Sequence, residues 1–317
     1  MTLYFGVLGN RDHIKRNKGT DQMIKAPFWE YLDEQPDGWL SSHAYKVESL
    51  PASDYQILDC GAWSYRAKEI PPVDSASMAL WYDSLAQDGA MVIAPDHMVV
   101  DPETADYRRQ WNREQAAAFI ELCPSRLVPM ACIHGTTTEE RIAHAVDLMA
   151  LGYRHLAVGG VAAQASRKPM VLALMATLRS ALPDVWLHIL GLSSPPYFAE
   201  WTRLGIESCD GSSHFKQAFT AGAFFTQDGP KLTKHQAARN DEPVTAPECD
   251  CSACRQLSAE GIDTRRYGSN ENNMGRAAHN LNMLMRAQKE AANAVSASGM
   301  REEQTTICLL YGGIVHG

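Results

Sequence analysis

Short apolar segments rich in β-forming residues alternate along this chain with longer segments of helical periodicity. The β-type segments cover residues 3–8, 55–59, 91–95, 127–133, 155–158, 185–190 and 206–209. Helical patterns lie between most of them, at residues 75–87, 109–122, 139–151 and 169–182, and the third follows a run of threonines typical of an N-terminal cap. Strands that alternate with helices predict a parallel sheet. Because seven or eight such units fit into about 230 residues, we predict an α/β fold of the (β/α)8 TIM barrel type rather than an open sheet.

The size and composition of the chain suit one large domain or a barrel with an appendage. Of its 317 residues, 45% are hydrophobic. A chain of this length buries roughly three quarters of the surface that its unfolded form exposes. The formal net charge of -8 gives the whole molecule no attraction for nucleic acid, so such a partner would have to use local basic patches. Two basic segments, residues 11–18 and 108–113, could supply them, although a solvated polar surface is the simpler interpretation of each one alone.

The sequence favours a cytoplasmic location. No apolar run is long enough for a membrane span, and the first residues enter an apolar strand without the basic region and long apolar core of a signal peptide. Five cysteines are scattered singly along the chain, as expected for reduced thiols. They are Cys60, Cys123, Cys132, Cys209 and Cys308.

The other three cysteines, Cys249, Cys251 and Cys254, fall within six residues of one another. Three thiolates and one imidazole form the tetrahedral set that Zn²⁺ prefers in a structural site. We predict His279 as the fourth ligand, because apolar residues at helical spacing follow it and its imidazole would be held at the start of a helix. The alternatives are another histidine as fourth ligand, or a few reduced cysteines near a surface loop. Four protein ligands leave no open position for a substrate, so the zinc ion is expected to be structural.

The prolines, cysteines and turn residues of residues 243–267 interrupt the alternation of strands and helices. We therefore predict three parts: a (β/α)8 barrel core at residues 1–242, a zinc-binding subdomain at residues 243–280, and a C-terminal helix that completes the barrel, with a tail, at residues 281–317. The apolar end at residues 311–317 could finish the fold or contact a second chain.

Aspartates and glycines stand at the ends of several predicted strands, where the chemistry of such barrels takes place. Asp59, Asp96 and Asp210 each follow a different strand, and Gly159-Gly160 follows another. One aspartate at a strand end is usually a helix cap or a turn former. Three of them around one barrel mouth could supply a nucleophile, an acid/base and a hydrogen-bond acceptor to one ligand. This set suits the exchange of a glycosidic bond through a covalent intermediate.

The order of these motifs along the chain resembles the tRNA-guanine transglycosylase family. The motifs are Leu58-Asp59-Cys60-Gly61, Pro95-Asp96, Ile133-His134-Gly135, Val158-Gly159-Gly160, His188-Ile189-Leu190-Gly191, Cys209-Asp210, the cysteine cluster and His279-Asn280-Leu281. Each motif alone is weak, but their order with the cysteine cluster is specific, and it covers most of the chain. The resemblance implies a zinc-containing (β/α)8 barrel that exchanges guanine for a 7-deazaguanine.

The resemblance also implies roles for individual residues. Asp210 would be the nucleophile that attacks C1′ of the target nucleotide, and Asp59 the general acid/base for the departing and incoming bases. Asp96 would accept hydrogen bonds from N1 and the exocyclic amine of the base. The backbone amides of Gly159 and Gly160 would approach its carbonyl edge, where the missing side chains give room.

Three further positions complete the implied base site. Trp63 and Leu190 match the positions that sandwich the base, although an ordinary core tryptophan is nearly as good an interpretation of Trp63. His134 stands where the tRNA enzymes have glutamine, and it could still donate a hydrogen bond to a purine oxygen.

Departures from the family pattern concern contacts to the polynucleotide. The Ser-Gly-Gly-Phe-Gln run of the tRNA enzymes is replaced by residues 60–64, and the Leu-Pro-Thr-Arg segment after the nucleophile is replaced by residues 212–216. Such departures resemble the DNA-modifying branch, which inserts 7-cyano-7-deazaguanine (preQ0) into DNA. We therefore expect DNA as the substrate, with tRNA as the alternative.

A duplex substrate requires the target base to be flipped out or the DNA to be opened by a helper protein. We expect a local basic patch to bind the nucleic acid beside the barrel mouth, formed by the loop after the first strand together with one residue after the nucleophile. Its predicted members are Arg11, Lys15, Arg16, Lys18 and Lys216. Family members often pair near the zinc subdomain, so the resemblance also suggests a homodimer.

Two other classes of function compete with base exchange. A non-catalytic zinc protein that binds nucleic acid would keep the cysteine cluster but would not need acids at three strand ends. A metal-dependent barrel hydrolase would need histidines and carboxylates around an open metal position, and the sequence has no H-x-H or H-x-x-x-H pair for it.

Overall fold

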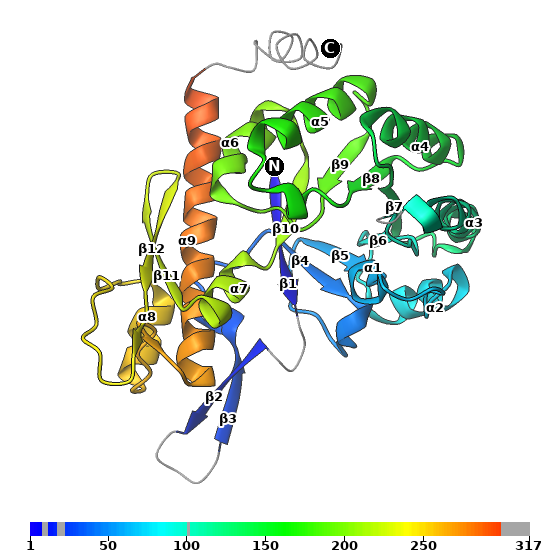
Figure 1. The fold of residues 1–317 in the computed structure, drawn as a ribbon. Helices are drawn as coiled ribbons and strands as arrows, with labels where there is room; N and C mark the ends of the chain where they lie inside the picture. Colours follow the sequence, from blue (N-terminus) through cyan, green and yellow to red (C-terminus); the bar gives the residue numbers. More distant parts are fainter. Residues whose placement is uncertain (8–11, 18–22, 100–101, 299–317) are drawn as a thin grey trace.

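The computed structural model describes residues 1–7, 12–17, 23–99 and 102–298. Eight parallel strands close into a barrel in the order β1-β10-β9-β8-β7-β6-β5-β4, and β4 pairs again with β1 (Figure 1). These strands are β1 (Thr2–Val7), β4 (Gly38–Ser42), β5 (Tyr55–Asp59), β6 (Met91–Ile93), β7 (Val128–Ile133), β8 (His155–Val158), β9 (Trp186–Ile189) and β10 (Ser208–Gly211). The predicted TIM barrel is confirmed.

Helices connect successive barrel strands and surround the barrel (Figure 1). They are α1 (Ala62–Tyr65), α2 (Ser75–Leu85), α3 (Ala105–Leu122), α4 (Thr138–Ala150), α5 (Lys168–Ala181), α6 (Pro195–Arg203) and α7 (Ser213–Thr220). Short 3-10 helices are η2 (Phe28–Tyr31), η3 (His43–Tyr45), η4 (Pro102–Thr104) and η5 (Ala162–Gln164). The predicted cap of α4 is present, because the Thr137 side chain accepts a hydrogen bond from the backbone N–H of Glu140.

Strand β4 is the barrel strand that the sequence did not reveal. Its residues, Gly-Trp-Leu-Ser-Ser, lack a continuous apolar run, yet all five are buried. The strand is buried because it closes the barrel between β1 and β5, with Ser42 in register with Asp59. Small residues suit this position: a Cβ at Gly38 would lie 2.4 Å from the Tyr4 ring.

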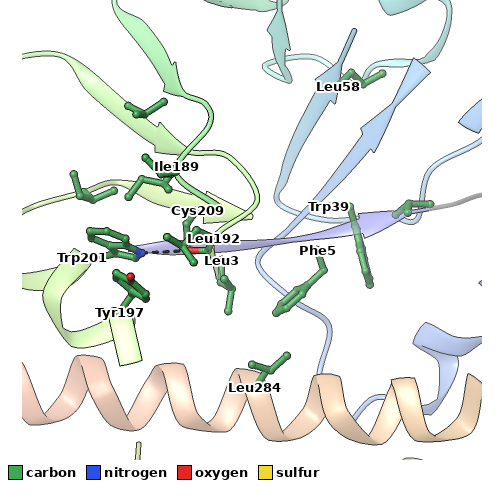
Figure 2. Packing of buried hydrophobic residues seen from close by; sticks show 14 of the residues in the cluster. Leu3, Phe5, Trp39, Leu58, Ile189, Leu192, Tyr197, Trp201, Cys209 and Leu284 are labelled. Carbon is green, nitrogen blue, oxygen red and sulfur yellow. Dashed lines mark hydrogen bonds between the residues drawn. The ribbon is translucent and has the colours of Figure 1, made fainter. Parts of the chain in front are cut away.

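The core has two layers, one inside the barrel and one between the barrel and its helices. The inner layer joins side chains from six strands: Tyr4, Leu40, Ile57, Met91, Ile93, Met130 and Ala157. The neighbours of Tyr4 along β1, Leu3 and Phe5, point outward into the second layer, as expected for the alternation of a strand. There they pack near Leu284 of helix α9 (Asn270–Ala297) (Figure 2).

The outer layer contains large, fully buried aromatic side chains. Trp201 of α6 is fully buried, and its indole N–H donates to the carbonyl of Leu192 at 3.4 Å (Figure 2). Its ring stacks on Tyr197 at a centroid distance of 5.0 Å. Removing a side chain of this kind typically costs 3–5 kcal/mol.

The remaining elements lie outside the barrel. A hairpin of β2 (His13–Asn17) and β3 (Met23–Pro27) follows β1, and a second hairpin of β11 (Ala223–Asp228) and β12 (Lys231–Gln236) follows α7. The short strands β13 (Ala238–Arg239) and β14 (Arg266–Tyr267) pair around α8 (Ser252–Ala259). The long helix α9 runs beside the barrel, next to α8 and both strands of the second hairpin (Figure 1).

The predicted division into three parts stays a prediction. Helix α9 continues through residue 280, where the second of the proposed boundaries falls, and the β11–β12 hairpin lies within residues 1–242 without joining the barrel sheet. The tail at residues 311–317 lies outside the described residues.

Candidate active site and metal centre

The predicted site residues stand at the carboxyl ends of the barrel strands. Asp59 ends β5, Asp210 is the next-to-last residue of β10, and His134 directly follows β7. Asp96 lies three residues beyond β6. Because all eight strands are parallel, these ends share one face of the barrel. The structure therefore brings the three predicted carboxylates to one end of the barrel.

Asp59 is held in surroundings that disfavour its charge. Its carboxylate accepts hydrogen bonds from the Gly61 backbone N–H, at 3.0 Å, and from the Ser42 side chain. Burial, followed by the negative charge of Asp96, outweighs these bonds and raises the pKa of Asp59 to about 7. Asp210 raises it further by a smaller amount. A carboxyl group with this pKa can both give and take a proton near neutral pH.

Asp96 is buried and is contacted on both carboxylate oxygens. His134 Nε2 lies 3.0 Å from Oδ2, and the Cys60 thiol donates to Oδ1 at 3.1 Å. Burial raises the pKa of Cys60, so its sulfur keeps the proton that it donates. The Tyr65 hydroxyl donates to the backbone carbonyl of Asp96 at 2.9 Å and lies 3.2 Å from the Cys60 sulfur. Asp96 is thus fixed as a hydrogen-bond acceptor at the barrel end.

The sequence did not identify Cys60, Tyr65 or a further histidine, His144, as partners in this site. The His144 Nδ1 accepts the backbone N–H of His134 at 2.9 Å, and burial lowers the pKa of His144 to about 4, which keeps it neutral. The position of Cys60 directly after Asp59 was the available signal. Tyr65 and His144 give no comparable signal, because their contacts depend on how helices α1 and α4 pack.

A second possible metal group lies beside Asp96, where the ligating atoms of Asp96, Cys132 and His134 fall within 4.8 Å of one another. Burial raises the pKa of the Cys132 thiol well above its usual range. Asp96 is also engaged by the Cys60 thiol.

Asp210 is positioned through one of its two carboxylate oxygens. Oδ1 accepts the Gly191 backbone N–H at 2.7 Å and lies 3.2 Å from Nε2 of His188. The fully buried His188 contacts the Ser208 hydroxyl through Nδ1 at 2.7 Å. His188 thus links the Ser208 hydroxyl to the Asp210 carboxylate. These bonds orient the carboxylate so that Oδ2 can face a reacting atom.

Gly159 and Gly160 form a turn with little room for side chains. Gly160 has a φ of +80°, and a Cβ on Gly159 would approach the Cys132 sulfur to 3.2 Å. The Arg141 guanidinium of α4 donates to the Gly159 carbonyl at 3.0 Å. Arg141 was not predicted as a site residue.

The predicted stacking residues lie in different surroundings. Trp63 is 62% exposed on α1, so it is not a core tryptophan. The Arg66 guanidinium covers its ring at 4.2 Å from the centroid and donates to its carbonyl at 2.6 Å. Leu190 is partly buried against the inner layer of the barrel. That these two side chains sandwich a base stays a prediction.

The predicted basic patch is described only in part. Arg11 and Lys18 lie outside the described residues, and Lys15 and Arg16 belong to strand β2 rather than to a loop. Lys216 is exposed on α7, three residues after that helix begins. The clustering of these five side chains stays a prediction.

The four predicted metal ligands meet in one place. The ligating atoms of Cys249, Cys251, Cys254 and His279 lie within 4.8 Å of one another, so the cluster could hold a metal ion. The His279 Nδ1 is 3.4 Å from the sulfur of Cys251 and 3.4 Å from that of Cys254. Nε2 of His279 points to the Phe225 carbonyl at 2.6 Å, which fixes Nδ1 as the nitrogen that faces the sulfurs.

The predicted position of His279 at a helix start was wrong. Helix α9 begins at Asn270, and the Ser269 side chain caps it by accepting the backbone N–H of Asn272. His279 therefore lies inside the helix, where its ring stacks on Phe224 at 3.8 Å. The turns before His279 were missed because they contain buried polar residues. One of them, Arg276, donates to the backbone carbonyls of Ala218 and Arg266.

The described residues contain no helix with the length and apolar character needed to cross a lipid bilayer.

Comparisons with known proteins agree with this geometry. The family model described as queuine tRNA-ribosyltransferase (TGT) matches residues 105–311, which include Asp210 and the metal cluster but begin after Asp59 and Asp96. A DNA-guanine transglycosylase of Salmonella montevideo is 25% identical over 188 residues, covering 54% of this chain and 43% of that protein. A queuine tRNA-ribosyltransferase of Actinobacillus succinogenes is 26% identical over 227 residues, covering 69% of this chain and 59% of that protein. A queuine tRNA-ribosyltransferase of Haemophilus ducreyi is 27% identical over 190 residues, covering 57% of this chain and 48% of that protein.

The chain thus spans about half the length of the curated relatives it matches. The family model nevertheless covers well over half of this chain, and the barrel and the cysteine cluster fit it. The chain belongs to the queuine tRNA-ribosyltransferase (TGT) family.

Proposed function

We propose that this protein exchanges a guanine base in DNA for a 7-deazaguanine, preQ0, through a covalent intermediate on Asp210. The observation that carries the proposal is the meeting of Asp59, Asp96 and Asp210 at one barrel end, each in different surroundings. A nucleophile, a proton carrier and a base receptor need such different surroundings. Membership of the transglycosylase family supports this division of roles.

Asp96 suits recognition of the base. Guanine and 7-deazaguanines present N1–H and the exocyclic amine on one edge, and a fixed carboxylate accepts both. The backbone amides after β8 can donate to the carbonyl oxygen on the next edge. In the structure the Cys60 thiol donates to Oδ1 of Asp96, and His134 Nε2 lies 3.0 Å from Oδ2. His134 would turn from Asp96 toward the purine oxygen when a base binds.

The reaction takes place in two balanced displacements. An Asp210 oxygen attacks C1′ of the nucleotide, the C1′–N9 bond breaks, and Asp59 gives a proton to the departing guanine. The incoming base then loses its N9 proton to Asp59, and its N9 attacks C1′ and displaces Asp210. Asp59 is protonated again at the end, because it has taken a proton from the incoming base. Its pKa of about 7 suits both proton transfers.

The cysteine cluster suits a structural zinc ion. Three sulfurs and one imidazole nitrogen provide the donor set that zinc prefers, and all four positions are filled by protein. The ion would join the segment that contains the cysteines to α9. In the same region Asn280 of α9 holds β11, accepting the Phe225 N–H and donating to the Ala223 carbonyl. The cluster thus stabilises the subdomain and takes no part in the base exchange.

The choice of DNA over tRNA rests on two observations. The segment after Asp210, residues 212–216, differs from that of the tRNA enzymes, and one relative is a DNA-guanine transglycosylase. DNA would need base flipping or a helper protein, and the basic residues near β2 and α7 would contact its phosphates. We expect a homodimer on the resemblance alone.

Transfer of radiolabelled guanine or preQ0 into DNA and, in parallel, into unmodified tRNA tests the proposal. The wild type is compared with Asp210→Ala and with Asp228→Asn, a control for an exposed aspartate in the β11–β12 turn. Incorporation into DNA alone, lost with Asp210→Ala and kept with Asp228→Asn, is expected. Incorporation into tRNA alone would replace DNA by the alternative substrate. Incorporation into neither, in the presence of a cell extract that supplies helper proteins, would overturn base exchange.

A further inference from the structure

Arg141 carries a positive charge at the base site with no acidic partner. Its side chain is half-buried, and among the residues that the structure describes no carboxylate oxygen lies within 4.0 Å of its guanidinium. Its side-chain hydrogen bond goes to the neutral carbonyl of Gly159. Burial lowers the pKa of Arg141, but an arginine of this kind stays charged at neutral pH. Partial removal of a cation from water without pairing it with an anion costs free energy, so its position calls for a functional reason.

The guanidinium lies between the ends of β7 and β8. A Cβ on Gly135, after β7, would come within 2.9 Å of the Arg141 Cγ, and a Cβ on Gly160, after β8, would come within 3.4 Å of its Nη2. Cys132 of β7 lies close enough to Arg141 to raise its pKa slightly against the larger, opposite effect of burial, which agrees with this position. Arg141 therefore borders the glycine turn that is expected to face the base.

The order of the barrel strands can be compared with the order of groups around the base. Around a 7-deazaguanine, the donor edge at N1 is followed by the carbonyl O6, then by the substituent on C7, and finally by N9, which joins the sugar. Around the barrel, Asp96 after β6 is followed by His134 after β7, the glycine turn after β8, and Asp210 on β10. If Asp96 binds N1, His134 and the amides after β8 donate to O6, and Asp210 attacks C1′, then the substituent on C7 comes next to the glycine turn after β8. That is the position of Arg141.

We infer that Arg141 determines which substituent the incoming base carries at C7, by rejecting an ammonium group and accepting a neutral hydrogen-bond acceptor such as a nitrile. The inference rests on the proposed function. A 7-aminomethyl group is a protonated amine at neutral pH, so it would meet the guanidinium as a like charge. Arg141 also donates a hydrogen bond to the Gly159 carbonyl. An ammonium group would need an acceptor of this kind, and Arg141 competes for it. A nitrile has no positive charge and offers a lone pair to the guanidinium N–H groups.

Binding of three free bases by isothermal titration calorimetry tests this role. The bases are guanine, 7-cyano-7-deazaguanine and 7-aminomethyl-7-deazaguanine, and the proteins are the wild type, Arg141→Gln, Arg141→Lys and Arg154→Gln. Arg154 is the matched control, because it also donates to backbone carbonyls but precedes β8 at the opposite end of the barrel.

We expect the wild type to bind the cyano base at least about tenfold more tightly than the aminomethyl base. Arg141→Gln should reduce this preference about tenfold while changing the affinity for guanine much less, whereas Arg141→Lys and Arg154→Gln should keep the preference. A variant that weakens all three bases equally would show that Arg141 only supports the turn, and would overturn the inference. A wild type that prefers the aminomethyl base would also overturn it.

The test separates the two proposals. Exchange of guanine that depends on Asp210, together with an unchanged ratio of base affinities in Arg141→Gln, refutes the inference and leaves the proposed function in place. A wild type that binds none of the three bases overturns both.

Discussion

Replacing Asp59 by asparagine should stabilise the folded protein at alkaline pH while it abolishes base exchange. The pKa of Asp59 is raised from 3.8 to about 7 in the folded protein. A shift of about three pKa units corresponds to about 4 kcal/mol of unfavourable free energy for the ionised form. Between these pKa values the folded state binds more protons than the unfolded state, so stability falls as pH rises. The penalty is absent below the unfolded pKa and is complete above about pH 7.

The asparagine variant removes this penalty but keeps an oxygen that can accept from the Gly61 N–H. It also removes the repulsion from Asp96. Because packing will not be perfect, we expect about 1–3 kcal/mol of the 4 kcal/mol to be recovered at pH 8, or a rise in Tm of roughly 2–5 °C for a chain of this size. At pH 4 or below, the variant and the wild type should have nearly the same stability.

Urea unfolding at pH 4 and pH 8 measures the difference directly, with Asp228→Asn as the control for the loss of an exposed carboxylate. A stability gain of the same size at both pH values would refute the reasoning, since it would arise from packing rather than from ionisation. A loss of stability at pH 8 would contradict the raised pKa itself.

Two further predictions concern the nucleophile and the metal cluster. His188→Phe should reduce kcat by about 10²-fold with little change in KM. It removes the side chain that orients Asp210 but keeps an aromatic ring in the buried position. An equal loss of affinity in a guanine-binding assay would argue against this positioning role. Cys254→Ser should reduce the zinc content below one ion per chain and lower Tm by several degrees, as measured by elemental analysis and calorimetry. If a chelator slowed base exchange by wild-type protein that was still folded, a structural role for the metal would be contradicted.

The sequence predicted the barrel because most of its strands carry their own apolar runs. Strand β4 was missed because its burial comes from closing the barrel between β1 and β5, which is a property of the whole sheet. The start of α9 was missed for a related reason. Its first turns bury Asn273 and Arg276, and the terminal nitrogens of Arg276 donate to distant backbone carbonyls and to Asn273, so the helix lacks a simple apolar stripe there.

In the candidate site too, some features follow from the local sequence, whereas others depend on contacts between residues far apart in the chain. Asp59, Asp96 and Asp210 could be predicted because a parallel barrel brings all of its strand ends to one face. Their hydrogen-bond partners are less accessible to sequence reasoning. His188 reaches Asp210 from the neighbouring strand, and Arg141 reaches Gly159 from helix α4. Such contacts depend on register and helix packing, which motif order along the chain does not specify.

These partners give three identical side chains three different surroundings. Burial, followed by the nearby charges of Asp96 and Asp210, raises the pKa of Asp59 to about 7. Asp210 receives the Gly191 backbone amide and lies beside His188 on the same oxygen, which fixes the orientation of its carboxylate. A mechanism that used Asp59 as the nucleophile would require a carboxyl group to act in ionised form in surroundings that favour its protonated form. This agrees with the proposal that Asp59 carries the proton and Asp210 is the nucleophile.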